Sequence, residues 1–472
     1  MRSIFNPVRA FLWVLLVAGS GLPGLQVYGQ SSDTLVLPPV LYLTEGVEAR
    51  VYYDNVVNFP DNHQISITCE VGVIGEHYWS FIPDAADEGW YPFRMQILDA
   101  EGTVLHEDHS VLSVHHAVAG TESFRMLLIG NSLTRPGIYQ SRLANRLSMA
   151  GVSYSTIGTV SVNGFRFEGY GGNSYQRYLE GPYYFRSPFV YSDTGFDPER
   201  YFEENAGGIR PTLLVVFLGI NDTFSASRAS DEAQETRLNE VMVTAHTFID
   251  GMRAAAPEAD VAIILTPAGS SQQQSFDAAY GEGVYTVEGW QKMRLKLISR
   301  YIAEFGNREE EGLFLVPVSV VVDRAGDYSS ADPIHPMTSG YEKIGDALYT
   351  WINYYLAPTT YSKWAVREFS ASNLTAGDAM ATANPDGDRL DNRGEFIFGM
   401  DPMAGSPSPL SLDAHGLSFR SRDGSAVILE YSSDLNDWNP WNGTVEEETV
   451  EGFHHRFIEF PELGTGFFRV RY

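Results

Sequence analysis

The chain has 472 residues, of which 32 are basic and 60 acidic, so its formal net charge is −28. Nucleic acid and anionic membrane surfaces repel so acidic a protein, and we therefore expect no nucleic-acid partner. A hydrophobic content of 44% and an aromatic content of 13% exclude a disordered chain and indicate packed globular domains.

Residues 1–30 have the composition of a secretory signal peptide. Arg2 and Arg9 give a positive start, "AFLWVLLVAG" gives an apolar core, and small residues near Gly29 suit cleavage. The alternative is an uncleaved anchor helix, but Gly and Pro residues interrupt the run. No later segment reaches the roughly 20 apolar residues of a membrane span, and the only cysteine, Cys69, lies outside the signal region. We expect a secreted or periplasmic bacterial protein without a stable membrane anchor.

Residues 31–120 follow a strand pattern. Short runs with apolar residues at every second position, such as "QISITCEVGV", are separated by the turn sequences "FPDNH" and "DAEG". The pattern predicts a small all-β sandwich domain.

Residues 121–358 alternate between buried strands and amphipathic helices. The predicted strands cover 125–130, 212–219, 261–267 and 313–321, and the predicted helices cover 139–152, 231–257, 286–306 and 339–356. Continuous apolar strands separated by helices are typical of an α/β domain with a parallel sheet.

The remainder of the chain changes character again. Residues 359–404 begin with a short helical piece, continue through the acidic stretch "NPDGDRLDNRGE" and end in a linker rich in Pro, Ser and Gly. Residues 405–472 alternate once more and predict a second small β module.

Polar residues of complementary chemistry follow the strands of the α/β region. Ser132 follows the first strand, Asn221 follows the second, and Asp332 and His335 follow the fourth. Carboxyl ends of parallel strands meet at one edge of a sheet, so one cleft could gather these side chains. They supply a nucleophile, an oxyanion donor, an orienting acid and a base. The alternative for Ser132 is the N-cap of the following helix.

These motifs, in this order, resemble the SGNH (GDSL-type) hydrolase family. "IGNSLT", "GYGG", "GIND" and "DPIHP" are similar to its four blocks, over residues 124–356. The resemblance implies a flavodoxin-like three-layer α/β sandwich with a parallel sheet, here flanked by small all-β domains in a secreted bacterial esterase. It makes Ser132 the nucleophile, His335 the base and Asp332 the acid that orients the base. The oxyanion hole would be the amides of Ser132 and Gly172 and the side chain of Asn221, and Gly171 could replace Gly172.

The implied reaction is ester hydrolysis through an acyl-enzyme, with no cofactor for catalysis. An O-acetylated carbohydrate is the substrate we expect. A lipid or lysophospholipid esterase and a catalytically silent glycan-binding protein are the alternatives. The aromatic side chains of one stretch could stack on sugar, line an acyl pocket, or form a small core of their own; they are Tyr183, Tyr184, Phe185, Phe189 and Tyr191.

The acidic stretch has the ligand spacing of an EF-hand or dockerin-like calcium loop. The predicted ligands, at positions 1, 3, 5, 7, 9 and 12, are Asn384, Asp386, Asp388, the Leu390 carbonyl, Asn392 and Glu395. Arg389 stands at position 6, where the motif requires glycine, although Gly387 could shift the turn. The sequence predicts a structural calcium site, and the alternative is a solvated acidic linker.

Overall fold

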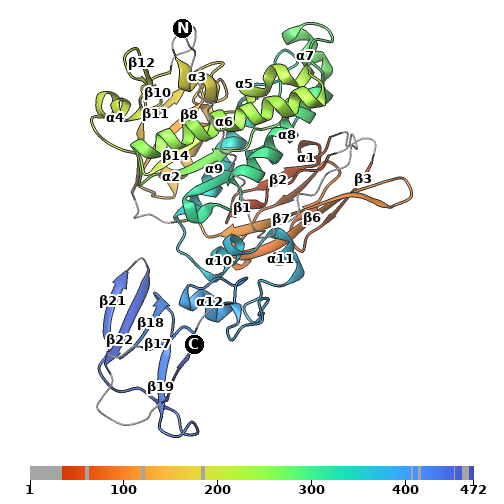
Figure 1. The fold of residues 1–472 in the computed structure, drawn as a ribbon. Coiled ribbons are helices and arrows are strands. Elements are labelled where there is room, and N and C mark those ends of the chain that lie inside the picture. The colour runs from red at the N-terminus through yellow and green to blue at the C-terminus, as the bar shows by residue number, and fades with distance from the viewer. Residues whose placement is uncertain are drawn as a thin grey trace, which may run out of the picture. The chain divides into compact units, whose positions relative to one another are not determined.

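The computed structural model describes residues 34–58, 63–118, 123–181, 187–405, 408–412, 416–450, 452–459 and 467–472 (Figure 1). The predicted signal peptide lies outside these residues. All of the described residues belong to one compact unit, Asp33–Tyr472. No helix in this part of the chain is long and apolar enough to cross a membrane.

The N-terminal region forms two sheets around a common core. One sheet has the order β1 (Val40–Thr44), β7 (Val104–His115), β6 (Gly89–Leu98), β3 (Gln64–Thr68), and the other has the order β2 (Ala49–Tyr52), β5 (Tyr78–Phe81), β4 (Val73–Ile74). A single turn of helix, α1 (Tyr53–Val56), follows β2. Trp79 from the second sheet and Phe93 from the first are fully buried in the shared core, with ring centroids 5.5 Å apart. Two sheets on one core agree with the strand pattern of this part of the sequence, and the single helical turn α1 was not expected from it.

A seven-stranded sheet forms the centre of the molecule. Its order is β10 (Val160–Val162), β11 (Phe165–Gly169), β8 (Phe124–Gly130), β14 (Leu213–Phe217), β15 (Asp260–Ile264), β16 (Leu313–Val316), and β9 (Tyr154–Ile157) also pairs with β8. The strands from β11 to β16 are parallel, but β10 runs antiparallel to β11. The expected parallel sheet is thus present from β11 to β16, and the antiparallel strand β10 extends it at one edge. A short turn at Asn163, with a φ of 51°, reverses the chain there.

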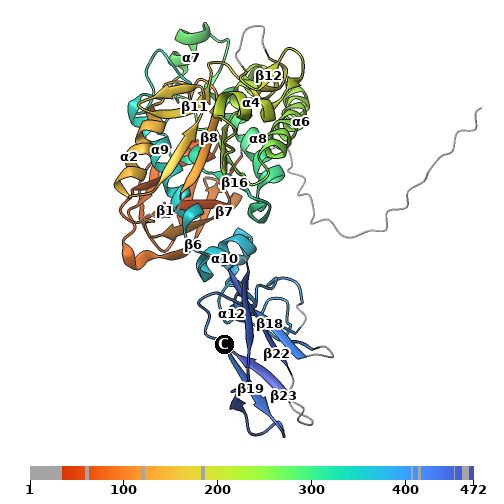
Figure 2. The same cartoon turned by 90° about the vertical axis from the view of Figure 1, so that its left-hand side faces the viewer.

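Helices cover both faces of this sheet, which gives three layers (Figure 2). On one face, α2 (Ile138–Met149) and α9 (Thr338–Leu356) share an apolar core with Met126 and Leu128 of β8. On the other face, α6 (Asp231–Ala255) and α8 (Val287–Phe305) share a core with Leu127 and Ile129. Alternate residues of one strand therefore enter different cores, as the period of a strand requires.

Short elements complete the central region. They are α3 (Tyr175–Glu180), β12 (Val190–Tyr191), β13 (Gly195–Phe196), α4 (Pro198–Ala206), α5 (Ile220–Thr223) and α7 (Gln273–Tyr280). Counting β9 and β11 as one position, the parallel strands follow the 2-1-3-4-5 order of flavodoxin-like sheets.

Buried polar bonds join the N-terminal sandwich to the central region. The Gln291 side chain donates to the carbonyls of Asp54, Asn55 and Val57 at 2.9, 3.2 and 3.1 Å. Two buried guanidinium groups add to this: Arg324 donates to the Asp54 carbonyl at 3.0 Å, and Arg294 donates to the Asn55 carbonyl. In return, the Asn55 amide donates to the Val322 carbonyl at 2.9 Å. Since buried backbone carbonyls require donors, each part satisfies the other.

The last part of the chain begins with the helices α10 (Tyr361–Glu368), α11 (Ala371–Ala376) and α12 (Asn392–Phe398). Two small sheets follow, with the orders β17 (Ser411–Leu412), β18 (Gly416–Arg422), β22 (Phe453–Glu459), β21 (Glu446–Val450), and β20 (Asn439–Pro440), β19 (Ile428–Ser432), β23 (Phe467–Arg471). Phe398 of α12 and Leu417 of β18 lie in one apolar cluster, which fixes the helix on the C-terminal module.

Candidate active site

Ser132 lies in a turn between β8 and α2. Helix α2 begins only at Ile138, and its N-cap is Gly137, with a φ of 73° and no side-chain cap. The alternative that Ser132 caps this helix is therefore wrong. The turn is held instead by Asn131, whose side-chain oxygen accepts the Leu133 N–H at 2.9 Å. Ser132 itself is half-buried and has no part in helix capping.

Asp332 and His335 form a tightly bonded pair on one loop. The His335 Nδ1 lies 2.9 Å from the Asp332 Oδ2. The Asp332 Oδ1 accepts the backbone N–H groups of Ile334 and His335, each at 3.0 Å. Partial burial opposes ionisation, but the hydrogen bonds from the ring and the amides outweigh it and lower the pKa of Asp332 below its ordinary value. The Asp-x-x-His spacing thus positions the imidazole ring from its own loop.

The second ring nitrogen of His335 is left for other chemistry. Its Nε2 is buried and has no hydrogen-bond partner within the described residues. With the carboxylate accepting at Nδ1, the proton of a neutral ring resides there and the lone pair resides on Nε2. This is the arrangement that a general base requires.

The loops that carry the predicted residues converge on one edge of the sheet. Gly130, at the end of β8, lies opposite both Phe217 and Gly169, at the ends of β14 and β11. Ser132, Asn221 and Gly172 follow these three positions. The His335 loop joins them because Ile334 packs in a cluster with Ile220, next to Asn221. Strand pairing and packing therefore bring the loops of all four sequence blocks to one edge of the sheet.

A hydrogen bond joins the Asn221 side chain to the loop that carries Gly171 and Gly172. The Asn221 side chain donates to the Asn173 carbonyl at 2.8 Å. The Asn173 N–H donates to the Tyr170 carbonyl at 3.2 Å, which closes a turn over Gly171 and Gly172. Gly172 has a φ of 78°, the conformation that the third residue of a type II turn needs. That turn uses neither glycine amide, so the choice between Gly171 and Gly172 as donor stays open.

Asp222 is a residue of this edge that the motif analysis missed. It accepts the Tyr175 N–H at 3.2 Å and links the Gly172 loop to the Asn221 loop. Burial raises the pKa of Asp222 to about 6, against the opposing effect of hydrogen bonds from backbone amides. Its position directly after Asn221, in the same helical turn, was the available signal.

The structure describes two of the five aromatic side chains that the sequence offered for substrate contact, Phe189 and Tyr191. Tyr183, Tyr184 and Phe185 lie outside the described residues. Phe189 is fully buried and its ring lies 4.6 Å from the Tyr201 ring, so it belongs to a core and cannot stack on substrate. Tyr191 is covered by the Arg200 guanidinium at 4.1 Å.

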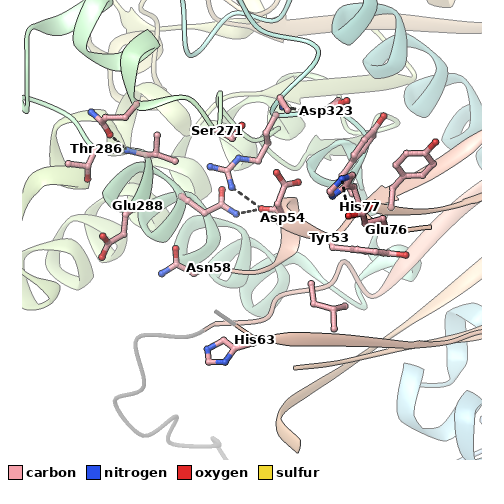
Figure 3. Close-up of a pocket in the computed structure, with 18 of the residues that line it drawn as sticks. Tyr53, Asp54, Asn58, His63, Glu76, His77, Ser271, Thr286, Glu288 and Asp323 are labelled. Carbon is pink, nitrogen blue, oxygen red and sulfur yellow. Dashed lines mark hydrogen bonds and ion pairs between the residues drawn. The ribbon is translucent and has the colours of Figure 1, made fainter. Parts of the chain in front are cut away.

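A groove of about 1110 Å³ lies between the N-terminal sandwich and the central region (Figure 3). Neither Ser132 nor His335 is among the described residues that line it. The groove wall adjoins the loop of Asp332 and His335, because Ser271 lines the groove and the neighbouring Ser270 N–H donates to the Pro333 carbonyl at 2.8 Å. Among the described residues, six carboxylates line the groove: Asp54, Glu76, Asp277, Glu282, Glu288 and Asp323.

The predicted calcium ligands lie far from this edge in sequence, before and within α12. Asp386, Asp388 and Glu395 each place one carboxylate oxygen within 4.8 Å of the others. Asn384 is engaged within the loop, accepting the Gly387 N–H at 2.8 Å and donating to the Asp388 carbonyl at 3.0 Å. The Asn392 amide donates to the carbonyls of Asp378 and Met380, while its Oδ1 is buried without a hydrogen-bond partner in the described residues. The Leu390 N–H donates to Asp388 at 2.6 Å.

No protein-family model and no curated protein matches the chain. Among solved structures, a family 3 carbohydrate esterase from Clostridium thermocellum is 17% identical, with a TM-score of 0.34, over 50% of this chain and 100% of its own. An aryl esterase from M. smegmatis is 18% identical, with a TM-score of 0.32, over 48% and 98%. A putative GDSL-like lipase from Parabacteroides merdae is 14% identical, with a TM-score of 0.28, over 50% and 98%. Likenesses this distant leave the activity to be argued from the site.

Proposed function

We propose that this protein is a serine ester hydrolase of SGNH type, with Ser132 as nucleophile, His335 as general base and Asp332 as the acid that orients the base. The observation that carries the proposal is the Asp332–His335 pair. Its 2.9 Å hydrogen bond fixes the ring, and the buried Nε2 is unpaired within the described residues. A nucleophile, a base and an orienting acid on loops at one sheet edge suit acyl transfer.

The reaction has two halves. The Ser132 oxygen attacks the ester carbonyl carbon while Nε2 of His335 takes the hydroxyl proton, and Asp332 stabilises the resulting imidazolium. The bond to the alcohol then breaks, and His335 returns the proton to the leaving oxygen. Water repeats the sequence on the acyl-enzyme, which releases the acid and restores the serine.

Negative charge that develops on the carbonyl oxygen needs donors already in place. We assign this role to the amides of Ser132 and Gly172 and to the Asn221 side chain. A carboxamide nitrogen carries two hydrogens, so Asn221 can keep its 2.8 Å bond to the Asn173 carbonyl and direct the second hydrogen at the substrate. That bond holds the donor before substrate arrives, as electrostatic preorganisation requires.

The substrate that we propose is an O-acetylated, uncharged carbohydrate. The groove beside the catalytic loop supports this, because its six carboxylates can accept hydrogen bonds from sugar hydroxyls. The same charges repel the phosphate of a lysophospholipid and the acid groups of uronic sugars. The protein is proposed to act outside the cytoplasm, where such polymers lie.

The deciding experiment measures acetate release from neutral and acidic acetylated polysaccharides, beside aryl esters of increasing acyl length. We expect acetate from the neutral polymers and a preference for short acyl chains, both absent in Ser132→Ala. A preference for long chains without acetate release would identify a lipid esterase instead. Folded protein that cleaves no ester but retains polysaccharide would identify a silent glycan-binding protein.

The groove itself can be tested separately. Glu282 is exposed on its wall, so Glu282→Arg should fold normally. We expect a higher KM for the polysaccharide and an unchanged KM for an aryl acetate. Glu258→Arg, an exposed charge reversal outside the residues that line the groove, is the matched control. Equal effects of the two variants on the polysaccharide would remove the groove from the proposal.

A further inference from the structure

The loop that precedes α12 directs several oxygens at one point. One carboxylate oxygen from each of Asp386, Asp388 and Glu395 lies within 4.8 Å of the other two. They occupy positions 3, 5 and 12 of a twelve-residue stretch that begins at Asn384. Calcium-binding loops supply carboxylates at these positions, and the last is a glutamate that binds through both oxygens.

Glu395 supplies the decisive observation. Its side chain is 0% exposed, and neither Oε1 nor Oε2 has a hydrogen-bond partner in the described part of the chain. The Asp386 Oδ2 is also buried and also has no hydrogen-bond partner among the described residues. A buried carboxylate without donors is very costly unless a cation compensates for it.

The backbone conformation of the loop explains why Arg389 is tolerated at position 6, where the calcium-loop motif requires glycine. The left-handed residue of the loop is Gly387, with a φ of 73°, at position 4. Arg389, at position 6, is not among the residues with positive φ. The loop therefore turns where it has a glycine, and Arg389 pays no conformational penalty.

We infer that residues 384–395 bind one calcium ion through the carboxylates of Asp386, Asp388 and Glu395. Hard divalent cations prefer oxygen ligands, and calcium accepts the many and irregularly placed oxygens that a flexible loop offers. Carbonyl and amide oxygens of the same loop can complete the shell, among them the Leu390 carbonyl.

The ion would fix α12 between two parts of the chain. On one side, Phe396 packs on Trp364 of α10, with ring centroids 5.6 Å apart. On the other side, Leu390 and Phe398 share an apolar cluster with the first strands of the C-terminal module. Glu395 lies on the helix and Asp386 on the loop, so one ion ties the helix to its own preceding segment. Removal of the ion should loosen residues 384–472 first.

The direct test is calorimetric titration of the chelator-treated full-length protein with calcium chloride. We expect one site per chain. Glu395→Gln keeps the side-chain shape and removes the charge, and it should weaken binding at least roughly tenfold, the worth of one charge-assisted contact. Asp437→Asn, an exposed carboxylate of the C-terminal module, is the control and should bind like the wild type. Absence of binding, or equal binding by Glu395→Gln, would overturn the inference.

Thermal unfolding gives a readout that a merely structural glutamate would not give. With chelator, Glu395→Gln should melt above the wild type, because it removes one of three carboxyl groups whose oxygens lie within 4.8 Å of one another. With saturating calcium the order should reverse. An order that does not depend on calcium would contradict the site.

Limited proteolysis checks the place of action. Chelation should accelerate cleavage within 384–472, while hydrolysis of a small aryl ester should not change. If Glu395→Gln does not fold, the double variant Asp386→Asn with Asp388→Asn replaces it, since an asparagine oxygen can still accept the loop bonds from the N–H groups of Asp388 and Leu390. Equal cleavage with and without calcium would overturn the stabilising role.

Discussion

The carboxyl groups of Asp332 and Glu395 lie in opposite hydrogen-bonding environments. Asp332 accepts a ring N–H and two backbone N–H groups, and its pKa is lowered. Glu395 is more deeply buried, accepts no hydrogen bond from the described residues, and has a pKa raised to about 8. The difference is in the donors that the surrounding backbone supplies. A carboxylate provided with donors can orient a neighbour, whereas one deprived of them must take up a proton or a cation.

The largest effect should come from a change at Ser132, the residue whose proton His335 is proposed to take. Ser132→Ala should lower ester turnover by about 10³-fold or more, because the proposed acyl-enzyme forms on the Ser132 hydroxyl. Circular dichroism should be unchanged, since the serine is in a turn and caps no helix. Ser141→Ala, a matched change on α2, should keep its turnover. Residual activity of Ser132→Ala above a tenth of wild type would mean that another residue attacks.

Isosteric changes in the two loops sharpen the comparison itself. Asp332→Asn should lower kcat by roughly 10²–10⁴-fold, because an amide no longer fixes the ring with its lone pair on Nε2. Asp386→Asn should leave kcat unchanged and weaken calcium binding. Steady-state kinetics and calcium titration give the kcat and the calcium affinity of each of the two variants. A loss of turnover in Asp386→Asn would show that the loops are coupled.

Asn221→Ala tests the oxyanion donor. We expect kcat to fall by about 10²-fold with little change in KM, because the donor acts on charge that exists only in the transition state. The variant also loses the bond to the Asn173 carbonyl, so its melting temperature should be recorded. An increase in KM with kcat preserved would place Asn221 in ground-state binding instead.

The smallest effect that we expect is a change in stability from Asp222. Its side chain is buried, as that of Glu395 is, but it accepts a backbone N–H, as that of Asp332 does. Its pKa is raised to about 6, so the unfolded chain loses this proton at lower pH than the folded chain does. The contribution of Asp222 to stability should therefore fall as the pH rises from about 4 to 6, by at most about 3 kcal/mol. Asp222→Asn should remove that part of the slope in urea unfolding measured across this range. An unchanged slope would assign it to other groups.

The sequence predicts the centre of the fold well. Strands β8, β14, β15 and β16 were expected because continuous apolar runs are typical of a sheet covered on both faces. Helices α6 and α8 start where Ser230 and Thr286 accept cap bonds from the backbone. Strands β9, β10 and β11 were missed, because short segments with exposed polar residues at a sheet edge lack that apolar signal.

The candidate site divides in the same way. The Asp332–His335 bond follows from spacing, because three residues of one loop can bring the two groups together. The burial of Phe189 does not follow, since an aromatic run has the same composition in a core and in a cleft. The carbonyls that Gln291, Arg294 and Arg324 bind could not be predicted either. Every residue has a backbone carbonyl, so the sequence does not mark which ones accept a side-chain donor.

Those carbonyl contacts have a consequence for the timing of synthesis. Asn55 and Val322, which share a hydrogen bond, are 267 residues apart. A ribosome adds roughly 5–20 residues each second, so the second partner is made roughly 10–50 s after the first. During most of that interval the residues that donate to the carbonyls of Asp54 and Asn55, namely Gln291, Arg294 and Arg324, have not yet been added to the chain. The N-terminal sandwich can reach its final state only after the central region exists, although it is translated first.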